Sequence, residues 1–270
     1  MITSPSNKRV KEIIQLQQKA KVRRERDLFV VEGTKMFLEA DPMKIREVYI
    51  SEDMEDCFSE ECRQKLKNLH NLSISYEVVT REVFHKMSDT QTPQGILCVM
   101  EQYHYTFSDL LGEASSEKKI PLLLVLEDIQ DPGNLGTVFR AGEGAGVSGI
   151  IMSSHTADIY NPKTIRSTMG SVYRMPFLYT EVLTETINHL KEHKITVYAA
   201  HLQGKENYDL YDYRTGCAFL IGNEGKGLRE ETAFCSDHFI RIPMLGNVES
   251  LNAAVASSLL VYEAARQRRK

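Results

Sequence analysis

The sequence predicts an α/β protein, and three observations lead to that fold class. The second half of the chain holds four continuous apolar runs, which are typical of strands covered on both faces in a parallel sheet. Helical segments lie between these runs, and strand–helix alternation with short connections also marks the first half. At 270 residues, the chain is long enough for one large domain or two ordinary ones.

The first part, residues 1–105, is predicted to be a small α/β domain. Its helices are expected at 9–26, 35–40, 52–69 and 81–87, and its strands at 29–31, 47–50, 73–79 and 95–100. Residues 106–120 are polar and lose this pattern, so they are predicted to be a linker.

The remaining part, residues 121–270, is predicted to be a doubly wound α/β domain. Its strands are expected at 121–126, 149–152, 196–200 and 218–221, and its helices around 135–145, 162–169, 183–192 and from Ser250 onward. Ser250 is predicted to be the N-cap of the last helix. The buried stripe of that helix is expected to consist of Leu251, Ala254, Val255, Leu259 and Tyr262.

Charge is unevenly distributed along the chain. The formal net charge is -4, but residues 1–26 hold eight basic and two acidic side chains, a net charge of +6. A basic segment of this kind attracts phosphate groups. A solvated amphipathic helix has the same composition, so the pattern alone leaves both interpretations open.

The cysteine pattern indicates a reducing compartment, because the five cysteines are scattered and form no Cys-x-x-Cys pair. The N-terminus lacks the apolar core of a signal peptide, and no apolar run approaches the roughly 20 residues that span a bilayer. We therefore expect a cytoplasmic protein that does not enter membranes. No metal site is predicted, because His189 and His193, although spaced i, i+4, have no evident third ligand.

Polar side chains gather where three segments pass from strand to helix. In the first, Pro132-Gly133 is predicted to form a tight turn, with Asn134 as the N-cap and Arg140 one to two turns into the helix. An arginine there can reach back over the strand ends, where open α/β sheets bind ligands. A plain helix cap and a surface charge would account for the same two residues.

The second segment, residues 219–228, ends a strand in a glycine-rich loop that lets backbone approach a ligand and carries Glu224. It is not a Walker A motif, because Gly227 and not Ser or Thr follows Lys226. The other glycine-rich run, 142–146, falls at a helix end and is interpreted as a C-cap, which argues against a dinucleotide fingerprint and a dehydrogenase.

The third segment, residues 240–252, delivers Asn247, Glu249, Ser250 and Asn252 to a helix N-terminus with exposed backbone N–H donors. Because all three segments share the order of strand, polar loop and helix, they are predicted to form one composite site.

Together these segments resemble the SpoU (TrmH) family of RNA ribose 2′-O-methyltransferases, over roughly residues 120–268. Residues 29–33 and 92–95 resemble, more weakly, the ribosomal-protein-like RNA-binding domain of members that modify large-subunit ribosomal RNA. The resemblance implies that residues 121–270 form an α/β knot, with a mostly parallel sheet and a C-terminal part tied in a trefoil. It also implies S-adenosylmethionine as cofactor, RNA as partner and a homodimer formed through the catalytic domain.

The resemblance further implies roles for individual residues. The family's cofactor contacts match Gly222, Ile242 and Leu251, with Met244 beside them. The family's activating residue matches Arg140, which Asn134, Glu224, Ser250 and Asn252 would orient together with the ribose. A guanidinium, with a pKa above about 12, is an unusual base. A cation that stabilises the developing alkoxide and grips the adjacent phosphate is therefore an alternative role.

In the first domain, RNA contacts are expected at Arg23, Arg24, Arg26, Lys35 and Gln94, although the loop of Gln94 could also be a simple strand-initiating turn. The predicted function is S-adenosylmethionine-dependent methylation of a ribose 2′-hydroxyl in 23S (large-subunit) ribosomal RNA. The alternatives are a transfer RNA ribose 2′-O-methyltransferase and a non-catalytic knotted RNA-binding protein. Every polar residue of the three motifs is present, which favours an enzyme.

Overall fold

The computed structural model describes residues 1–112 and 120–269, and its internal contacts divide the chain into two compact units. The first unit consists of Met1–Tyr103 and Asp158–Tyr173, and the second of His104–Ala157 and Arg174–Lys270. The segment 158–173, expected to belong to the second domain, thus packs within the first unit.

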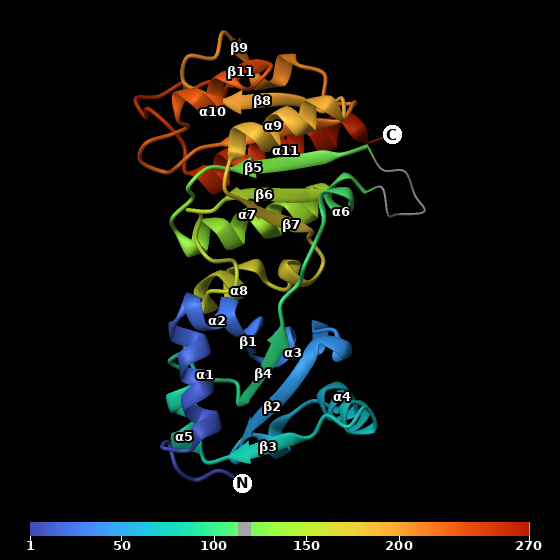
Figure 1. Ribbon diagram of the computed structural model, residues 1–270, viewed down its shortest axis with the longest axis vertical. Helices are drawn as coiled ribbons and strands as arrows, with labels where there is room; N and C mark the ends of the chain where they lie inside the picture. The colour runs from blue at the N-terminus through green and yellow to red at the C-terminus, as the bar shows by residue number, and fades with distance from the viewer. Residues whose placement is uncertain (113–119, 270) are drawn as a thin grey trace. The chain divides into compact units, whose positions relative to one another are not determined.

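The first unit is built on a four-stranded sheet in the order β1-β4-β2-β3 (Figure 1). Strand β4 is antiparallel to both of its neighbours, and β3 is parallel to β2. The helices and strands of this unit are α1 (Lys8–Gln18), α2 (Ala20–Arg26), β1 (Leu28–Glu32), α3 (Thr34–Glu39), β2 (Ile45–Ser51), α4 (Glu60–Asn71), β3 (Tyr76–Val79), α5 (Arg81–Met87), β4 (Ile96–Glu101) and α8 (Pro162–Thr168).

The single helix predicted over 9–26 is wrong, because the chain breaks at Lys19 into α1 and α2. Lys19 has an extended backbone. The Arg23 guanidinium donates hydrogen bonds to the carbonyl oxygens of Leu16 and Gln17, at 2.6 and 3.0 Å. These carbonyls lie in the last turn of α1, where no intrahelical donor is available to them. The break therefore allows a residue of α2 to cap the end of α1.

The segment 158–173 is fixed within the first unit by buried contacts. Asp158 accepts two hydrogen bonds from Arg23, at 2.6 and 2.9 Å. The ring of Tyr160 packs on Phe29, with 4.5 Å between ring centroids. The hydroxyl of Tyr160 also accepts a hydrogen bond from the backbone N–H of Tyr103, at 2.6 Å.

The second unit contains a seven-stranded, fully parallel sheet in the order β7-β6-β5-β10-β8-β11-β9. This confirms the predicted α/β class with a mostly parallel sheet. The helices and strands are α6 (Phe107–Leu111), β5 (Leu122–Leu126), α7 (Pro132–Ala145), β6 (Gly149–Ser153), β7 (Phe177–Thr180), α9 (Leu183–Glu192), β8 (Thr196–Ala200), β9 (Glu206–Asn207), β10 (Cys217–Ile221), α10 (Glu230–Phe234), β11 (His238–Arg241) and α11 (Ala253–Arg268).

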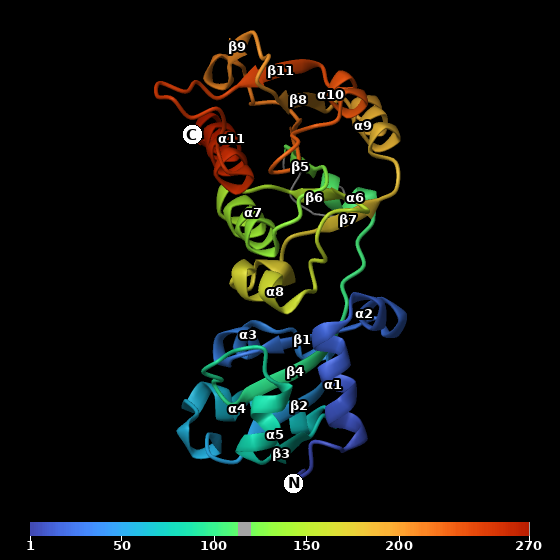
Figure 2. The ribbon, with the colours of Figure 1, turned by 90° about the vertical axis from the view of Figure 1, so that its left-hand side faces the viewer.

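Helices cover both faces of this sheet (Figure 2). Helices α7 and α11 lie on one face, and α6, α9 and α10 lie on the other. Strands β5 and β10 are adjacent at the centre, and every residue of both is buried. The loops that follow these two strands therefore emerge side by side at the carboxyl edge, where open α/β sheets bind ligands.

The predicted linker 106–120 is partly wrong. Its first residues form the short helix α6, which begins with a capping box between Thr106 and Asp109. Leu110 and Leu111 of α6 are buried in the core of the second unit. Residues 113–119 of the predicted linker lie outside the described residues.

The predicted start of the last helix is wrong, and its predicted buried face is correct only at Ala254. Asn252, and not Ser250, is the N-cap of α11. The buried residues are Ala253, Ala254, Ser257, Leu260, Val261 and Ala264. Val255, Leu259 and Tyr262 are instead exposed. The small side chains of the buried face allow α11 to pack closely on α7 and on strands β5 and β10.

Among the described helices, none combines the length and the apolar character that a membrane crossing requires.

Candidate active site

The loop between β5 and α7 places the first predicted site residue. Asp131 is the N-cap of α7, and its side chain accepts a hydrogen bond from the backbone N–H of Asn134 at 2.8 Å. The predicted cap, Asn134, is therefore wrong, because Pro132 and Gly133 lie inside the first helical turn. Relieved of capping, the Asn134 side chain is available for contacts outside its own helix.

Asn134 joins three segments that are distant in sequence. Its side-chain N–H donates to Glu224 Oε1 at 3.0 Å, and its side-chain oxygen accepts a hydrogen bond from the Asn252 amide at 2.9 Å. Glu224 also accepts hydrogen bonds from the backbone N–H groups of Gln130 and Asp131, both at 3.1 Å. The structure thus brings Asn134, Glu224 and Asn252 together in one hydrogen-bonded network at the carboxyl edge of the sheet.

The charge of Glu224 is stabilised by these donors. Partial burial raises the pKa of its carboxyl group, but the hydrogen bonds from Asn134 and from the backbone of Gln130 and Asp131 outweigh burial, so the net pKa is lowered. An ionised carboxylate that accepts several N–H bonds resists protonation. Glu224 therefore remains an acceptor at neutral pH.

The glycine-rich loop after β10 is held in one shape by its own backbone. Asn223 and Gly227 exchange two backbone hydrogen bonds, at 3.1 and 2.9 Å. A Cβ atom on Gly222 would lie 2.2 Å from backbone atoms of Gly227 and Leu228, so only glycine fits there. The side-chain amide of Asn223 donates to the carbonyl oxygen of Asp128 at 2.7 Å and thereby ties this loop to the one after β5.

Two supporting residues of this region escaped the sequence analysis. Asn223 shapes the loop that presents Glu224. Its position between Gly222 and Glu224 in the glycine-rich segment is the sequence feature that could have indicated this role. Glu127 is buried and accepts hydrogen bonds from the backbone and the guanidinium of Arg229, at 2.7 and 2.8 Å. A carboxylate directly after an apolar strand was a second signal, since a buried charge needs partners.

Arg140 lies on α7 and is exposed to solvent. Its guanidinium makes no hydrogen bond or ion pair with the part of the chain that the structure describes. Ser250 is also exposed and has no hydrogen-bond partner within residues 1–112 and 120–269. The structure therefore leaves both predicted residues outside the Asn134–Glu224–Asn252 network, with polar groups directed to solvent.

The loop between β11 and α11 carries the other predicted cofactor residues. Ile242, Met244 and Leu251 are partly buried. From Pro243 to Leu251, no backbone group forms a hydrogen bond with another described residue. Backbone N–H and C=O groups require partners. The availability of these backbone groups fits a cofactor that is bound largely through backbone groups, as the resemblance implies for S-adenosylmethionine.

The predicted RNA contacts of the first unit differ in accessibility. Arg23 is 2% exposed and bound to Asp158 and to two carbonyl oxygens, so its assignment as an RNA contact is wrong. Arg24 is exposed, and Arg26 and Lys35 pair with Glu12 and Glu39 at the surface. The side chain of Gln94 accepts hydrogen bonds from the backbone N–H and the hydroxyl of Thr34, which fixes the start of α3.

Comparison with protein-family models gives two matches. Residues 121–262 match the SpoU rRNA methylase family, and residues 7–98 match the MRM3-like substrate-binding domain. The first match covers more than half of the chain. The chain belongs to the SpoU rRNA methylase family.

Individual SpoU relatives match nearly the whole chain. A 23S rRNA (guanosine(2553)-2′-O)-methyltransferase of Bacillus subtilis, RlmP, is 30% identical over 263 residues, which are 97% of each protein. The crystal structure of an rRNA methyltransferase from Sinorhizobium meliloti is 30% identical, with a TM-score of 0.81, and covers 98% of this chain and 96% of its own. An AdoMet-bound structure of the enzyme from the same organism matches with the same TM-score.

The SpoU methylase AviRb from Streptomyces viridochromogenes, in complex with AdoMet, is 24% identical and has a TM-score of 0.85, which supports the fold alone. With the family identified, the predicted resemblance is confirmed for both parts of the chain.

Within the described residues, no group of three or more His, Cys, Asp or Glu side chains is arranged to hold a metal ion.

Proposed function

We propose that this chain is an S-adenosylmethionine-dependent methyltransferase that modifies a ribose 2′-hydroxyl in 23S (large-subunit) ribosomal RNA. The observation that carries the proposal is the hydrogen-bonded network of Asn134, Glu224 and Asn252 at the carboxyl edge of the SpoU sheet. Relatives that match along nearly the full length carry names of ribosomal RNA methyltransferases. A ribosomal RNA substrate also implies a cytoplasmic enzyme.

The residues divide the work between cofactor and substrate. S-adenosylmethionine supplies an electrophilic methyl group that a ribose oxygen can attack in line. Gly222, Ile242, Met244 and Leu251 would hold it through backbone groups and apolar contacts. Asn134, Glu224 and Asn252 fix the loops around the ribose, which keeps the reacting atoms aligned.

Arg140 provides the positive charge near the reacting ribose oxygen. Because its guanidinium is exposed and makes no ion pair with the described residues, it is available to an RNA phosphate and to the developing negative charge on the ribose oxygen. Ser250, which is also exposed, is close enough in sequence to Asn252 to orient the same nucleotide. While the guanidinium of Arg140 stays protonated, the 2′-hydroxyl proton leaves to solvent; Arg140 acts as the base only after its guanidinium has lost a proton.

The exposed stripe on α11 supports a homodimer formed through the catalytic domain. Val255, Leu259 and Tyr262 are spaced four and three residues apart, so they lie on one helical face. They are 48%, 37% and 47% exposed. An apolar stripe of this kind marks an interaction surface. A second copy of α11 offers the same surface, as a symmetric dimer requires.

A trefoil knot is supported by the path of the chain after β11. Strand β11 lies near one edge of the sheet. After the loop 242–252, the chain returns to the centre, where α11 packs on α7, β5 and β10. A C-terminal helix that returns from an outer strand to the centre of the sheet fits a knot, which is a rare exception to ordinary topology.

The test uses ribosomal RNA from a strain that lacks this gene. We expect purified protein to transfer a methyl group from S-adenosylmethionine to one ribose of the large-subunit RNA, read by nucleoside mass spectrometry. Arg140→Ala should abolish transfer but retain cofactor binding in isothermal titration. Arg214→Ala, which removes only a surface pair with Asp212, is the control. Methylation of a base or of transfer RNA, or full turnover by Arg140→Ala, would contradict the proposal.

A further inference from the structure

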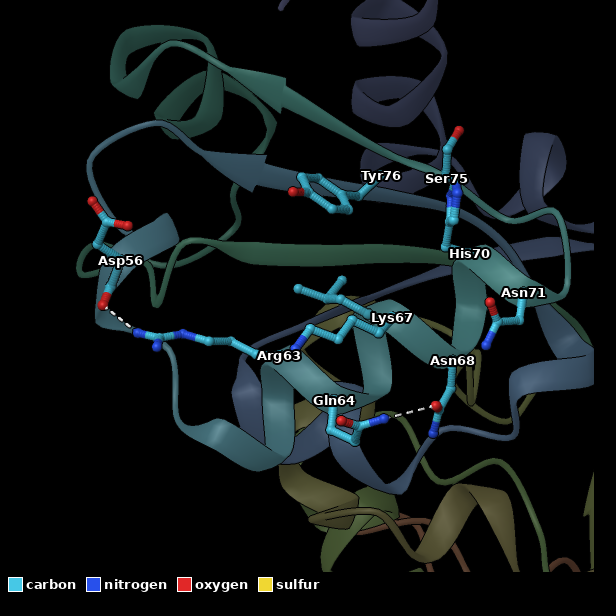
Figure 3. A pocket seen from close by; sticks show the side chains of 10 residues that line it. Asp56, Arg63, Gln64, Lys67, Asn68, His70, Asn71, Ser75 and Tyr76 are labelled. Atoms are coloured by element: carbon cyan, nitrogen blue, oxygen red, sulfur yellow. Dashed lines mark hydrogen bonds between the residues drawn. The ribbon is translucent and has the colours of Figure 1, made fainter.

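A pocket lined mainly by polar residue types opens in the first unit between α4 and β3, away from every residue assigned a role above (Figure 3). Its volume is about 950 Å³. It is lined by Asp56, Arg63, Gln64, Leu66, Lys67, Asn68, His70, Asn71, Ser75 and Tyr76.

Two cations lie on the α4 wall of the pocket. Arg63 and Lys67 are four residues apart, so they lie on the same face of the helix. Arg63 is positioned by a hydrogen bond to the carbonyl oxygen of Asp56, at 2.7 Å. Lys67 makes no hydrogen bond or ion pair with any described residue. The pocket therefore offers one anchored cation and one cation without a partner among the described residues, a combination that suits adjacent phosphates.

An aromatic ring forms the opposite wall. Tyr76, the first residue of β3, is 40% exposed. In Figure 3 its ring lies across the pocket from Arg63 and Lys67. An accessible ring beside cations is the arrangement on which single-stranded nucleic acids stack their bases.

Side-chain amides complete the lining. Gln64, Asn68 and Asn71 lie on α4, and the side-chain amide of Gln64 donates a hydrogen bond to that of Asn68 at 3.1 Å. Amides both donate and accept, as recognition of the edge of an unpaired base requires. Asp56 is the only carboxylate among the ten lining residues, against two cations, and it lies beside Arg63 at one end of the pocket.

We propose that this pocket binds an unstacked nucleotide of a single-stranded RNA segment, with the base on Tyr76 and its phosphates at Arg63 and Lys67. The inference rests on the proposed function for its choice of RNA as ligand. The match of residues 7–98 to a substrate-binding domain places the pocket in the part of the chain expected to contact substrate. It would position the RNA while the second unit carries out methyl transfer.

The experiment measures binding of a fluorescent large-subunit RNA transcript to the full-length chain by anisotropy. Tyr76→Ala should weaken binding about 5- to 150-fold, the range for loss of one base stack. Tyr76→Phe should bind like the wild type, because the ring is retained. Lys67→Ala should reduce the slope of log affinity against log salt by about 0.7, the contribution of one phosphate contact on a single strand.

Lys86→Ala provides the matched control, since Lys86 is an exposed lysine of α5 in the same unit and does not line the pocket. Its affinity should equal that of the wild type. In turnover assays, Tyr76→Ala should raise KM for RNA and leave kcat and cofactor binding unchanged. Wild-type affinity in both Tyr76→Ala and Lys67→Ala, or equal losses in Lys86→Ala, would overturn the inference. A wild-type protein that binds RNA without methylating it would refute the proposed function, while the Tyr76 variants would still decide the pocket.

Discussion

Glu224 illustrates how one side chain can tie two loops together. It accepts hydrogen bonds from the amide of Asn134 and from two backbone N–H groups of the loop after β5. A glutamine in its place would keep the length of the side chain but would offer a single acceptor oxygen. The network therefore depends on the ionised carboxylate, which gives it a defined response to pH.

We expect Glu224→Gln to unfold at a lower temperature than the wild type at pH 7. Because the pKa of Glu224 is lowered from its ordinary 4.5, the contribution of the carboxylate to stability is complete above about pH 4.5. It is lost as the pH falls through the depressed pKa, so the difference in Tm should shrink only below pH 4.5. Exposure to solvent keeps the difference small.

Calorimetry between pH 7 and pH 3 measures this difference. Glu230→Gln changes an exposed glutamate that has no hydrogen bond to the described residues, and its Tm should follow the wild type at each pH. A Tm difference for Glu224→Gln that stays constant down to pH 3 would contradict the prediction.

The residue types in the sequence indicate a polar site, but they do not show which side chains form hydrogen bonds with one another within it. Asp131-Pro132-Gly133-Asn134 contains two side chains able to cap a helix, three residues apart. Likewise Ser250 and Asn252 both suit an N-cap. The structure selects Asn252 because its side-chain oxygen caps α11 while its side-chain N–H group reaches Asn134. These choices depend on tertiary contacts that local sequence does not contain.

The glycine-rich loop after β10 works as a preformed element. Its two ends meet so closely that Gly222 has no room for a side chain, whereas a Cβ on Gly225 would meet only the side-chain oxygen of Asn223, at an ordinary 3.7 Å. Replacing Gly222 or Gly225 by alanine therefore makes the same chemical change in one loop, but only the change at Gly222 creates a steric clash.

Gly222→Ala should force the loop open, because its Cβ would overlap backbone that cannot move aside. We expect a clear fall in Tm and at least a tenfold loss of affinity for S-adenosylmethionine (~1.4 kcal/mol), measured by isothermal titration. Gly225→Ala should bind the cofactor as the wild type does. Similar affinities in the two variants would count against the loop as a cofactor element.

Helix α11 carries the prediction about assembly. Leu259→Arg places a charge in the middle of the exposed apolar stripe, so the proposed homodimer should dissociate, as measured by sedimentation velocity at micromolar concentration. Leu72→Arg makes the same change at an exposed leucine of the first unit and should leave the dimer intact. A wild-type protein that sediments as a monomer would refute the proposed interface.

In the second unit, strands buried on both faces were predictable, whereas the short strands at the two edges of the sheet were not. Strands β5, β6, β8 and β10 coincide with the four apolar runs to within about a residue, since burial on both faces demands such runs. Strand β7 was missed because it has four residues, and β9 because it has two. The sequence does not predict the buried face of α11, because Val255, Leu259 and Tyr262 are apolar but exposed, whereas small residues such as Ala253 and Ser257 are buried.

The stability of the first unit depends on an ion pair between buried Arg23 and partly buried Asp158, which are 135 residues apart in sequence. Removing one partner of a buried pair costs about 3–5 kcal/mol, and Arg23→Ala would leave the Asp158 carboxylate and the carbonyl oxygens of Leu16 and Gln17 without this donor. We expect a loss of this order in Arg23→Ala, measured by urea unfolding, and a change of less than about 0.5 kcal/mol in the exposed neighbour Arg24→Ala. Equal losses in the two variants would contradict this account.

The position of residues 158–173 has a consequence for the modular exchange of these units. The segment is encoded between β6 and β7, yet Ile159, Tyr160, Ile165 and Val172 are buried in the first unit. A chimera that joins residues 1–103 to another methylase must therefore include residues 158–173 as well. This requires two further junctions inside the gene of the other methylase. Exchange at a single breakpoint would leave these apolar side chains exposed to water, so the substrate-binding half and this segment have to be exchanged together although they are not contiguous in the gene.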